Sequence, residues 1–215
     1  MKAKPRSNKI LVPVDGSDRS LNTVRYIAKI KPFHQMQIVL FHVYAGAPES
    51  YFDLGKDPRS TGTVAYVRAW EIQQKINARD YMEKARRILL HAGFPEEDVT
   101  VKIQKRKQGI ARDIIKEARE GYDAVVARRR ELGALRGIVL GSVANKLLEK
   151  LNFLPLLLAG RTAVGKKLLL AFDGSRGAMQ AVNFVGSTMG SSDFIGRVTN
   201  KVIHMARGRT VWVVR

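Results

Sequence analysis

Cysteine is absent from this sequence of 215 residues. Its absence excludes disulfides, thiol catalysis and thiolate metal sites, and with them a secreted protein held together by disulfides. Acidic residues are scarce, with 19 Asp and Glu against 38 Lys and Arg, so the formal net charge is +19. A hydrophobic content of 45% is ample for a buried core, which argues against disordered and low-complexity proteins.

Long apolar runs are missing as well. The longest, at 154–160 and 168–172, are far shorter than the roughly 20 residues that span a bilayer. The basic N-terminus is not followed by the apolar core and cleavage site of a signal peptide, so we expect the mature chain to start near Met1. These absences predict a cytoplasmic protein without a membrane partner.

Two pairs of similar segments indicate an internal repeat. Residues 10–28 match residues 168–186 at an offset of 158, and both read as an apolar strand, an Asp-Gly-Ser turn and a helix. Residues 141–150 resemble residues 196–205 at an offset of only 55. The second copy is therefore about 103 residues shorter than the first, and it retains its beginning and its end.

The offsets predict the domain boundaries. We expect a complete domain at 1–160, a linker at 161–167 and a truncated second repeat at 168–215. So short a repeat buries too little surface to stand alone. We expect its last strand, 210–214, to pair with the strand at 154–158 of the same chain or of a partner chain, since an open apolar edge invites aggregation.

Within the first copy, apolar runs alternate with helical patterns. Continuous apolar runs predict strands buried on both faces, whereas residues 99–104 alternate as an edge strand does. Such alternation is typical of a doubly wound α/β domain with a five-stranded parallel sheet. The predicted strands are 10–14, 37–43, 99–104, 124–127 and 154–158. The first predicted helix is capped by Ser17 or Asp18 and has Leu21, Val24 and Ile27 on one face, and the later ones are 63–92, 110–120 and 141–151.

Several motifs in this order resemble the universal stress protein family: VPVDGS at 12–17, HV at 42–43, DAVV at 123–126 and LRGIVLGSV at 135–143. The resemblance covers residues 9–160 and both ends of the second copy, so the chain looks like a tandem protein with a truncated second domain. It implies a sheet order of 3-2-1-4-5 and dimers in which fifth strands pair antiparallel. It also implies a role in regulation or binding in the stress response.

One branch of that family binds ATP or AMP, and the resemblance implies a candidate site here. The matching residues are Asp15 and Val43 for adenosine, and Gly141 and Ser142 for phosphate, with Val143 beside them. The family's loop has two glycines where this chain has Arg128 and Glu131. Glycines let phosphate approach backbone N–H groups, so these replacements weaken a triphosphate site, although arginine side chains can contact phosphate instead.

Each candidate residue also has a structural alternative. Asp15 either binds a ribose hydroxyl at the switch point of the sheet or caps the following helix. Ser142 either donates to phosphate or is merely a first-turn helix residue. We therefore expect a protein that requires no cofactor, with ATP or AMP as its candidate ligand.

Other patterns in the sequence do not predict catalysis. Residues 160–167 match most of a P-loop, but a strand rather than a helix follows them. The four histidines have no metal-ligand spacing, and no nucleophile elbow or carboxylate pair stands out. We expect a protein that is not an enzyme, apart from slow nucleotide hydrolysis.

The excess positive charge supports a second hypothesis. Residues 102–136 hold 11 Lys and Arg against 5 Asp and Glu, with basic triplets at 105–107 and 128–130. Such a field attracts nucleic acid or other polyanions without sequence specificity, or it simply keeps the protein soluble. The sequence shows no helix-turn-helix, zinc finger or similar recognition motif.

Overall fold

The computed structural model describes residues 8–47, 61–128, 141–159, 169–170, 176–189 and 211–213. The remaining residues are not described. They include the predicted linker at 161–167, the segment 196–205 that resembles 141–150, and Glu131 with Arg129, Arg130 and Arg136.

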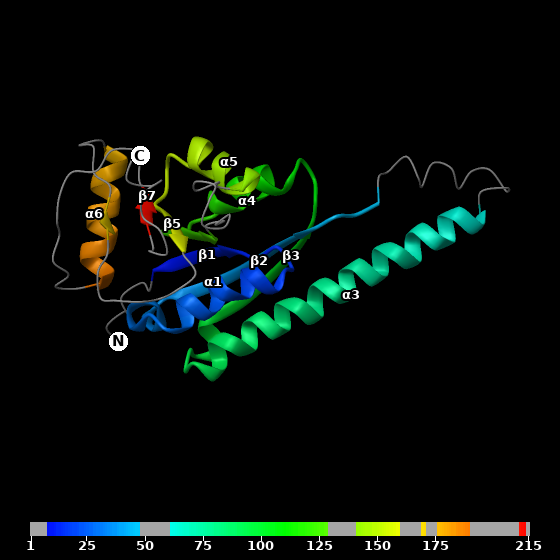
Figure 1. Ribbon diagram of the computed structural model, residues 1–215, viewed down its shortest axis with the longest axis horizontal. Helices are drawn as coiled ribbons and strands as arrows, with labels where there is room; N and C mark the ends of the chain where they lie inside the picture. Colours follow the sequence, from blue (N-terminus) through cyan, green and yellow to red (C-terminus); the bar gives the residue numbers. More distant parts are fainter. Residues whose placement is uncertain are drawn as a thin grey trace, which may run out of the picture.

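A single twisted sheet organises the molecule, in the order β3-β2-β1-β4-β5-β7-β6 (Figure 1). The first five strands are all parallel, in the predicted order 3-2-1-4-5. The strands are β1 (Lys9–Pro13), β2 (Gln37–Tyr44), β3 (Val99–Lys105), β4 (Ala124–Arg128), β5 (Leu156–Ala159), β6 (Leu169–Leu170) and β7 (Val211–Val213).

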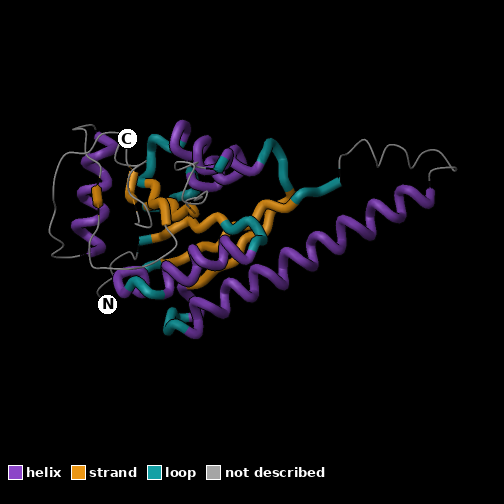
Figure 2. The backbone as a smooth tube through the Cα atoms, viewed as in Figure 1, coloured by secondary structure: helices purple, strands orange, loops and turns teal. Residues whose placement is uncertain are grey.

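Helices cover both faces of this sheet. In Figures 1 and 2, α1 and α3 lie below the strands, and α4 and α5 lie above them. The α-helices are α1 (Asp18–Ala28), α3 (Thr61–His91), α4 (Ile110–Ala118), α5 (Ser142–Lys150) and α6 (Arg176–Met189), and short 3₁₀ turns form η1 (Lys31–Gln35) and η4 (Glu96–Asp98).

The core has two layers because neighbouring residues of a strand face opposite ways. Ile10 and Val12 of β1 belong to the layer under α1 and α3, whereas Leu11 belongs to the layer under α4 and α5. All three side chains are fully buried. The continuous apolar pattern of β1 is thus explained by burial on both faces, as expected for a central parallel strand.

The predicted architecture is confirmed, with small shifts at the ends of elements. The longest helix begins at Thr61 rather than at residue 63, and β5 begins at Leu156 rather than at residue 154. β3 pairs with β2 alone among the described strands, which agrees with its alternating pattern.

The end of the chain extends the sheet beyond β5. β7 pairs antiparallel with β5, with Leu157 opposite Trp212, and β6 pairs parallel with β7. Helix α6 lies beyond this edge, and its Phe184 and Val185 join the core layer of α1 and α3. Residues 210–214 were expected to pair with the strand at 154–158 of the same chain or of a partner chain, and in this structure β7 pairs with β5 of the same chain.

Candidate functional site

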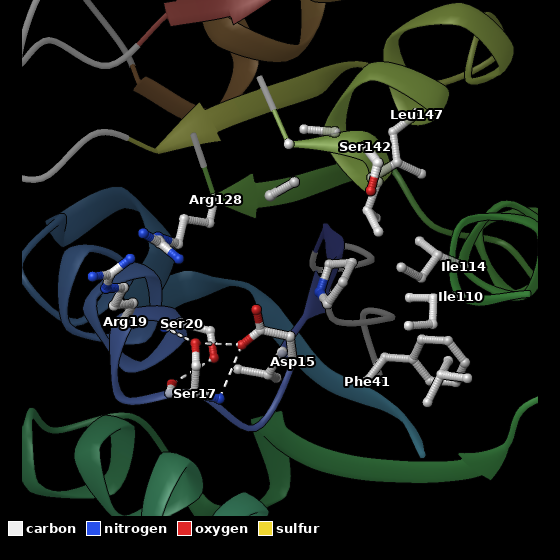
Figure 3. A pocket seen from close by; sticks show the side chains of 17 residues that line it. Asp15, Ser17, Arg19, Ser20, Phe41, Ile110, Ile114, Arg128, Ser142 and Leu147 are labelled. Carbon is white, nitrogen blue, oxygen red and sulfur yellow. Dashed lines mark hydrogen bonds between the residues drawn. The ribbon is translucent and has the colours of Figure 1, made fainter. Parts of the chain in front are cut away.

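A cavity of about 390 Å³ opens at the carboxyl ends of β1, β2 and β4. Its wall is completed by the first turns of α1, α4 and α5 (Figure 3). In this strand order, β1 and β4 are the neighbours at which the chain changes direction across the sheet, the place where open α/β sheets bind ligands. All the residues that the sequence nominated line this one cavity: Asp15, Val43, Arg128, Gly141, Ser142 and Val143.

The turn after β1 holds the Asp15 carboxylate in place. The backbone N–H and the hydroxyl of Ser17 both donate to Asp15 Oδ1, at 3.0 and 2.6 Å. Partial burial raises the pKa of Asp15, but the Ser17 hydrogen bonds and the charge of Arg128 outweigh burial, so the pKa lies below its ordinary value. The carboxylate is therefore ionised at neutral pH and keeps lone pairs for a further donor.

The helix cap and the candidate ligand group are different residues. Ser17 is the N-cap of α1, and its hydroxyl oxygen accepts from the Ser20 N–H at 3.2 Å. The alternative in which Asp15 itself caps the helix is thus not what the structure contains. Asp15 instead orients the capping serine.

The turn needs glycine at position 16. Gly16 has a φ of +83°, a conformation that residues with a side chain rarely adopt. A Cβ at this position would lie 3.4 Å from Cε1 of His42. His42 is itself buried and donates from Nδ1 to the carbonyl oxygen of Val14 at 2.7 Å, which ties β2 to the end of β1.

Tyr81 braces the same turn from the long helix. Its hydroxyl donates to the Ser17 carbonyl oxygen at 2.7 Å and lies 2.6 Å from the Ser20 hydroxyl. Partial burial, together with the nearby Asp15 and Asp18, raises the pKa of Tyr81, so the hydroxyl stays protonated at physiological pH. Sequence patterns did not single out this residue, since it lies 64 positions from Ser17.

Two arginines give one side of the cavity a positive charge. Figure 3 shows the side chains of Arg128, at the end of β4, and Arg19, in the first turn of α1, extending toward each other beside Asp15. Arg19 was not a candidate from sequence, where nothing distinguishes it from other exposed arginines. The pair provides planar donors of the kind that bind phosphate.

The first turn of α5 faces the cavity from the opposite wall. Gly141 is its N-cap and supplies no capping side chain, while Ser142, Val143 and Ala144 line the cavity. The first N–H groups of any α-helix lack partners within the helix, and they carry the positive end of its dipole. This wall is suited to an anion.

The remaining wall is apolar. It consists of Phe41 and Val43 from β2, Ile110 and Ile114 from α4, and Leu147 from α5. The site therefore combines an apolar slot, one carboxylate and a cationic side, and a mainly apolar lining with a few polar groups is typical of small-molecule sites. In the part of the chain that the structure describes, no group of three or more His, Cys, Asp or Glu could hold a metal ion.

Comparisons with known proteins point the same way as the fold. Residues 7–158 match the sequence model of the universal stress protein family. A universal stress protein of Mycolicibacterium smegmatis is 31% identical over 140 residues, which is 65% of this chain but only 44% of that protein. This chain thus matches less than half the length of its relative.

Solved structures share the fold. The match to a universal stress protein from Archaeoglobus fulgidus covers 93% of this chain and 71% of that protein's chain, with a TM-score of 0.61 at 19% identity. The match to the universal stress protein UspA of Lactobacillus plantarum covers 68% of this chain and 94% of that protein's chain, with a TM-score of 0.50 at 17% identity. These similarities concern the arrangement of helices and strands.

Proposed function

The chain belongs to the universal stress protein family, and we propose that it is a noncatalytic binding protein that takes an adenine nucleotide in the cavity between β1 and β4. The observation that carries this proposal is the convergence of an apolar slot, the Asp15 carboxylate and two arginines on one cavity at the switch point of the sheet. A volume of about 390 Å³ lies at the small end of the range of roughly 300–1,000 Å³ found for ligand pockets. The cavity therefore suits a single nucleotide.

The walls divide the ligand into three parts. The base lies in the slot formed by Phe41, Val43 and Ile114, and a ribose hydroxyl donates to Asp15. The phosphate meets the first turn of α5 on one side and Arg128 on the other. Because arginine replaces a loop glycine, side chains rather than bare backbone neutralise the charge. We accordingly expect AMP to bind at least as tightly as ATP.

Isothermal titration tests this assignment. Wild-type protein is titrated with adenosine, AMP and ATP, at low and at physiological salt. Replacement of Arg128 by Ala should weaken AMP binding by about tenfold or more and leave adenosine binding within about twofold, because a charged hydrogen bond contributes roughly 1.5–3 kcal/mol. Equal losses for adenosine and AMP would contradict a phosphate role for Arg128.

Nucleic acid is the alternative ligand that the positive charge suggests, and salt separates it from a nucleotide. Charge-driven binding to duplex DNA should fall steeply between about 50 and 200 mM salt. Adenosine carries no phosphate and should be held almost equally at both. A protein that binds DNA but neither adenosine nor AMP at low salt would favour the alternative.

We also propose that residues 168–215 are the remainder of a second family domain. The support is the order of β6, α6 and β7, and the pairing of β6 with β7 directly, as expected where the intervening strands are missing. In the family pattern, fifth strands of two subunits pair antiparallel. Here β7 takes that position against β5. The chain would thus supply its own partner strand.

A further inference from the structure

The outer half of α3 exposes an unusual amount of apolar surface. Six large hydrophobic side chains are exposed in the described part of the chain, and four of them lie within 11 residues of this helix. They are Tyr66, Trp70, Ile72 and Ile76, with exposed fractions of 73, 39, 60 and 43%. Figure 1 shows this half of the helix projecting beyond the sheet.

The inner half of the same helix behaves differently. Ala78, Met82, Ala85 and Leu89 are buried, and the last three belong to the core layer that α1 covers. Its outward positions are polar or charged, among them Asp80, Glu83, Lys84 and Arg87. An ordinary amphipathic helix thus continues into a segment whose outward side carries these four apolar side chains among polar ones, including Gln73 and Asn77.

Basic side chains border the apolar strip. Arg68, Lys75 and Arg79 are exposed and are spaced seven and four residues apart, so they share one side of the helix. Ile72 follows Arg68 by four residues and Ile76 follows Ile72 by four, which puts the apolar strip directly beside the basic one. Within residues 64–79 the one acidic residue is Glu71, which forms an ion pair with Lys105 at 2.8 Å and is only 20% exposed, and the next exposed acid along the helix is Asp80, directly after Arg79.

The basic strip continues onto the sheet. The ion pair between Glu71 and Lys105 joins α3 to the end of β3, where the exposed Arg106 and Lys107 follow. The backbone N–H of Arg106 donates to the carbonyl oxygen of Tyr44 at 2.9 Å, which fixes these residues beside the end of β2. One end of the molecule therefore carries apolar side chains and at least five exposed cations.

We propose that this end of the molecule, the outer half of α3 at residues 64–79 with Arg106 and Lys107, binds the surface of an anionic membrane. Ile72 and Ile76 enter the boundary between headgroups and acyl chains, Tyr66 and Trp70 lie at headgroup level, and the basic side chains contact lipid phosphates. An interfacial helix of this composition is held by buried apolar area together with attraction to anionic lipid. Aromatic rings of this kind favour the membrane–water interface.

Charge favours lipid over a second copy of the chain. A net charge of +19 makes two copies repel, and the exposed surface of residues 64–79 offers no acid to pair with the basic strip. The proposal departs from the expectation of no membrane partner, because that expectation rested on the lack of a membrane-spanning run, and association at the surface needs no such run. Among the described residues, no helix is long and apolar enough to cross a membrane. No residue of α3 lines the nucleotide cavity, so this surface is separate from that site.

The test is cosedimentation of the full chain with vesicles of phosphatidylcholine alone and of two parts phosphatidylcholine to one part phosphatidylglycerol. We expect binding to the mixed vesicles at least tenfold stronger than to the neutral ones. The double variants I72S/I76S and R68Q/K75Q should each lower binding to the mixed vesicles at least fivefold. Because all four side chains are exposed, both variants should keep the wild-type circular dichroism and melting temperature.

Matched controls remove the same kinds of group elsewhere. Met179→Ser removes an exposed apolar side chain from α6, and R112Q/K146Q removes two exposed cations from α4 and α5. Each should change binding less than twofold. Equal losses in the controls, or no preference of the wild type for anionic vesicles, would overturn the proposal.

Two further measurements test whether α3 itself contacts the lipid and whether a second copy of the chain binds the same surface. In a Trp212→Phe background, the emission of Trp70 should shift to the blue on mixed vesicles, and an unshifted spectrum would contradict contact through α3. Sedimentation velocity without lipid should give a species of one mass at all concentrations. Concentration-dependent dimers that disappear in I72S/I76S would overturn the proposal in favour of self-association.

Discussion

Gly16 offers the sharpest test of how the turn after β1 builds the candidate site. Its φ of +83° is unfavourable for alanine, at a cost of roughly 1–2 kcal/mol. The new Cβ would lie 3.4 Å from His42 Cε1, an ordinary van der Waals distance, so steric overlap adds little. Gly16→Ala should therefore lower the free energy of unfolding by about 1–2 kcal/mol and the melting temperature by roughly 2–8 °C.

Gly121 supplies the matched control, since its φ of +79° imposes the same backbone strain and a Cβ at that position would meet no atom of the described chain within 4 Å. Gly121→Ala should be destabilised by a similar amount. The two variants should differ in their affinity for AMP, measured by titration. Gly16 precedes Ser17, whose N–H and hydroxyl both bond Asp15, so relaxation of the turn should weaken AMP binding about tenfold in Gly16→Ala, with less than a twofold effect in Gly121→Ala. Similar affinities in both variants would refute the claim that this turn positions the ligand.

Three other predictions follow from the contacts described. The pKa of Asp15 lies below its ordinary value, so the stability that the ionised carboxylate contributes is present at neutral pH and is lost as the pH falls below about 4. The difference in unfolding free energy between wild type and Asp15→Asn should therefore be constant from pH 7 to 5 and shrink in stronger acid. Tyr81→Phe should weaken AMP binding severalfold. In urea titrations it should lower the free energy of unfolding by only about 1 kcal/mol, since the Ser17 carbonyl keeps its bonds from Ser20. An unchanged AMP affinity would argue against a bracing role for Tyr81. A chain cut after Arg161 exposes the edge of β5 and should associate further or precipitate in sedimentation velocity, whereas unchanged solubility and oligomeric state would show that β7 is dispensable.

The sheet could be predicted because it depends on local patterns, and six of the 17 residues that line the cavity were nominated through the resemblance to the family. Continuous apolar runs identified β1 and β2, and the Asp-Gly-Ser turn marked the point where the first strand ends. Asp15, Val43 and Ser142 were nominated through the resemblance to the family's motifs; Asp15 and Val43 lie where the first two strands end, and Ser142 begins a later helix. Carboxyl ends of parallel strands meet at one edge of the sheet, which is why residues far apart in the chain could be assigned to one site.

The rest of the site depends on tertiary contacts that leave no local signal. Tyr81 occupies a position of α3 that would look like any half-buried helical residue, and its hydroxyl reaches Ser17 only because α3 packs beside α1. Ile110 and Ile114 read as ordinary core residues of an amphipathic helix, yet they form a wall of the cavity. Arg19 becomes notable only because β4 brings Arg128 opposite to it.

The pairing of β7 with β5 changes how this edge responds to dilution. Two separate chains that pair through their edges come apart when their concentration falls below the dissociation constant. A strand joined to the same chain is instead present at an effective concentration that does not fall on dilution. The edge of β5 thus stays covered however few copies a cell contains, and the melting temperature of the protein should not depend on its concentration.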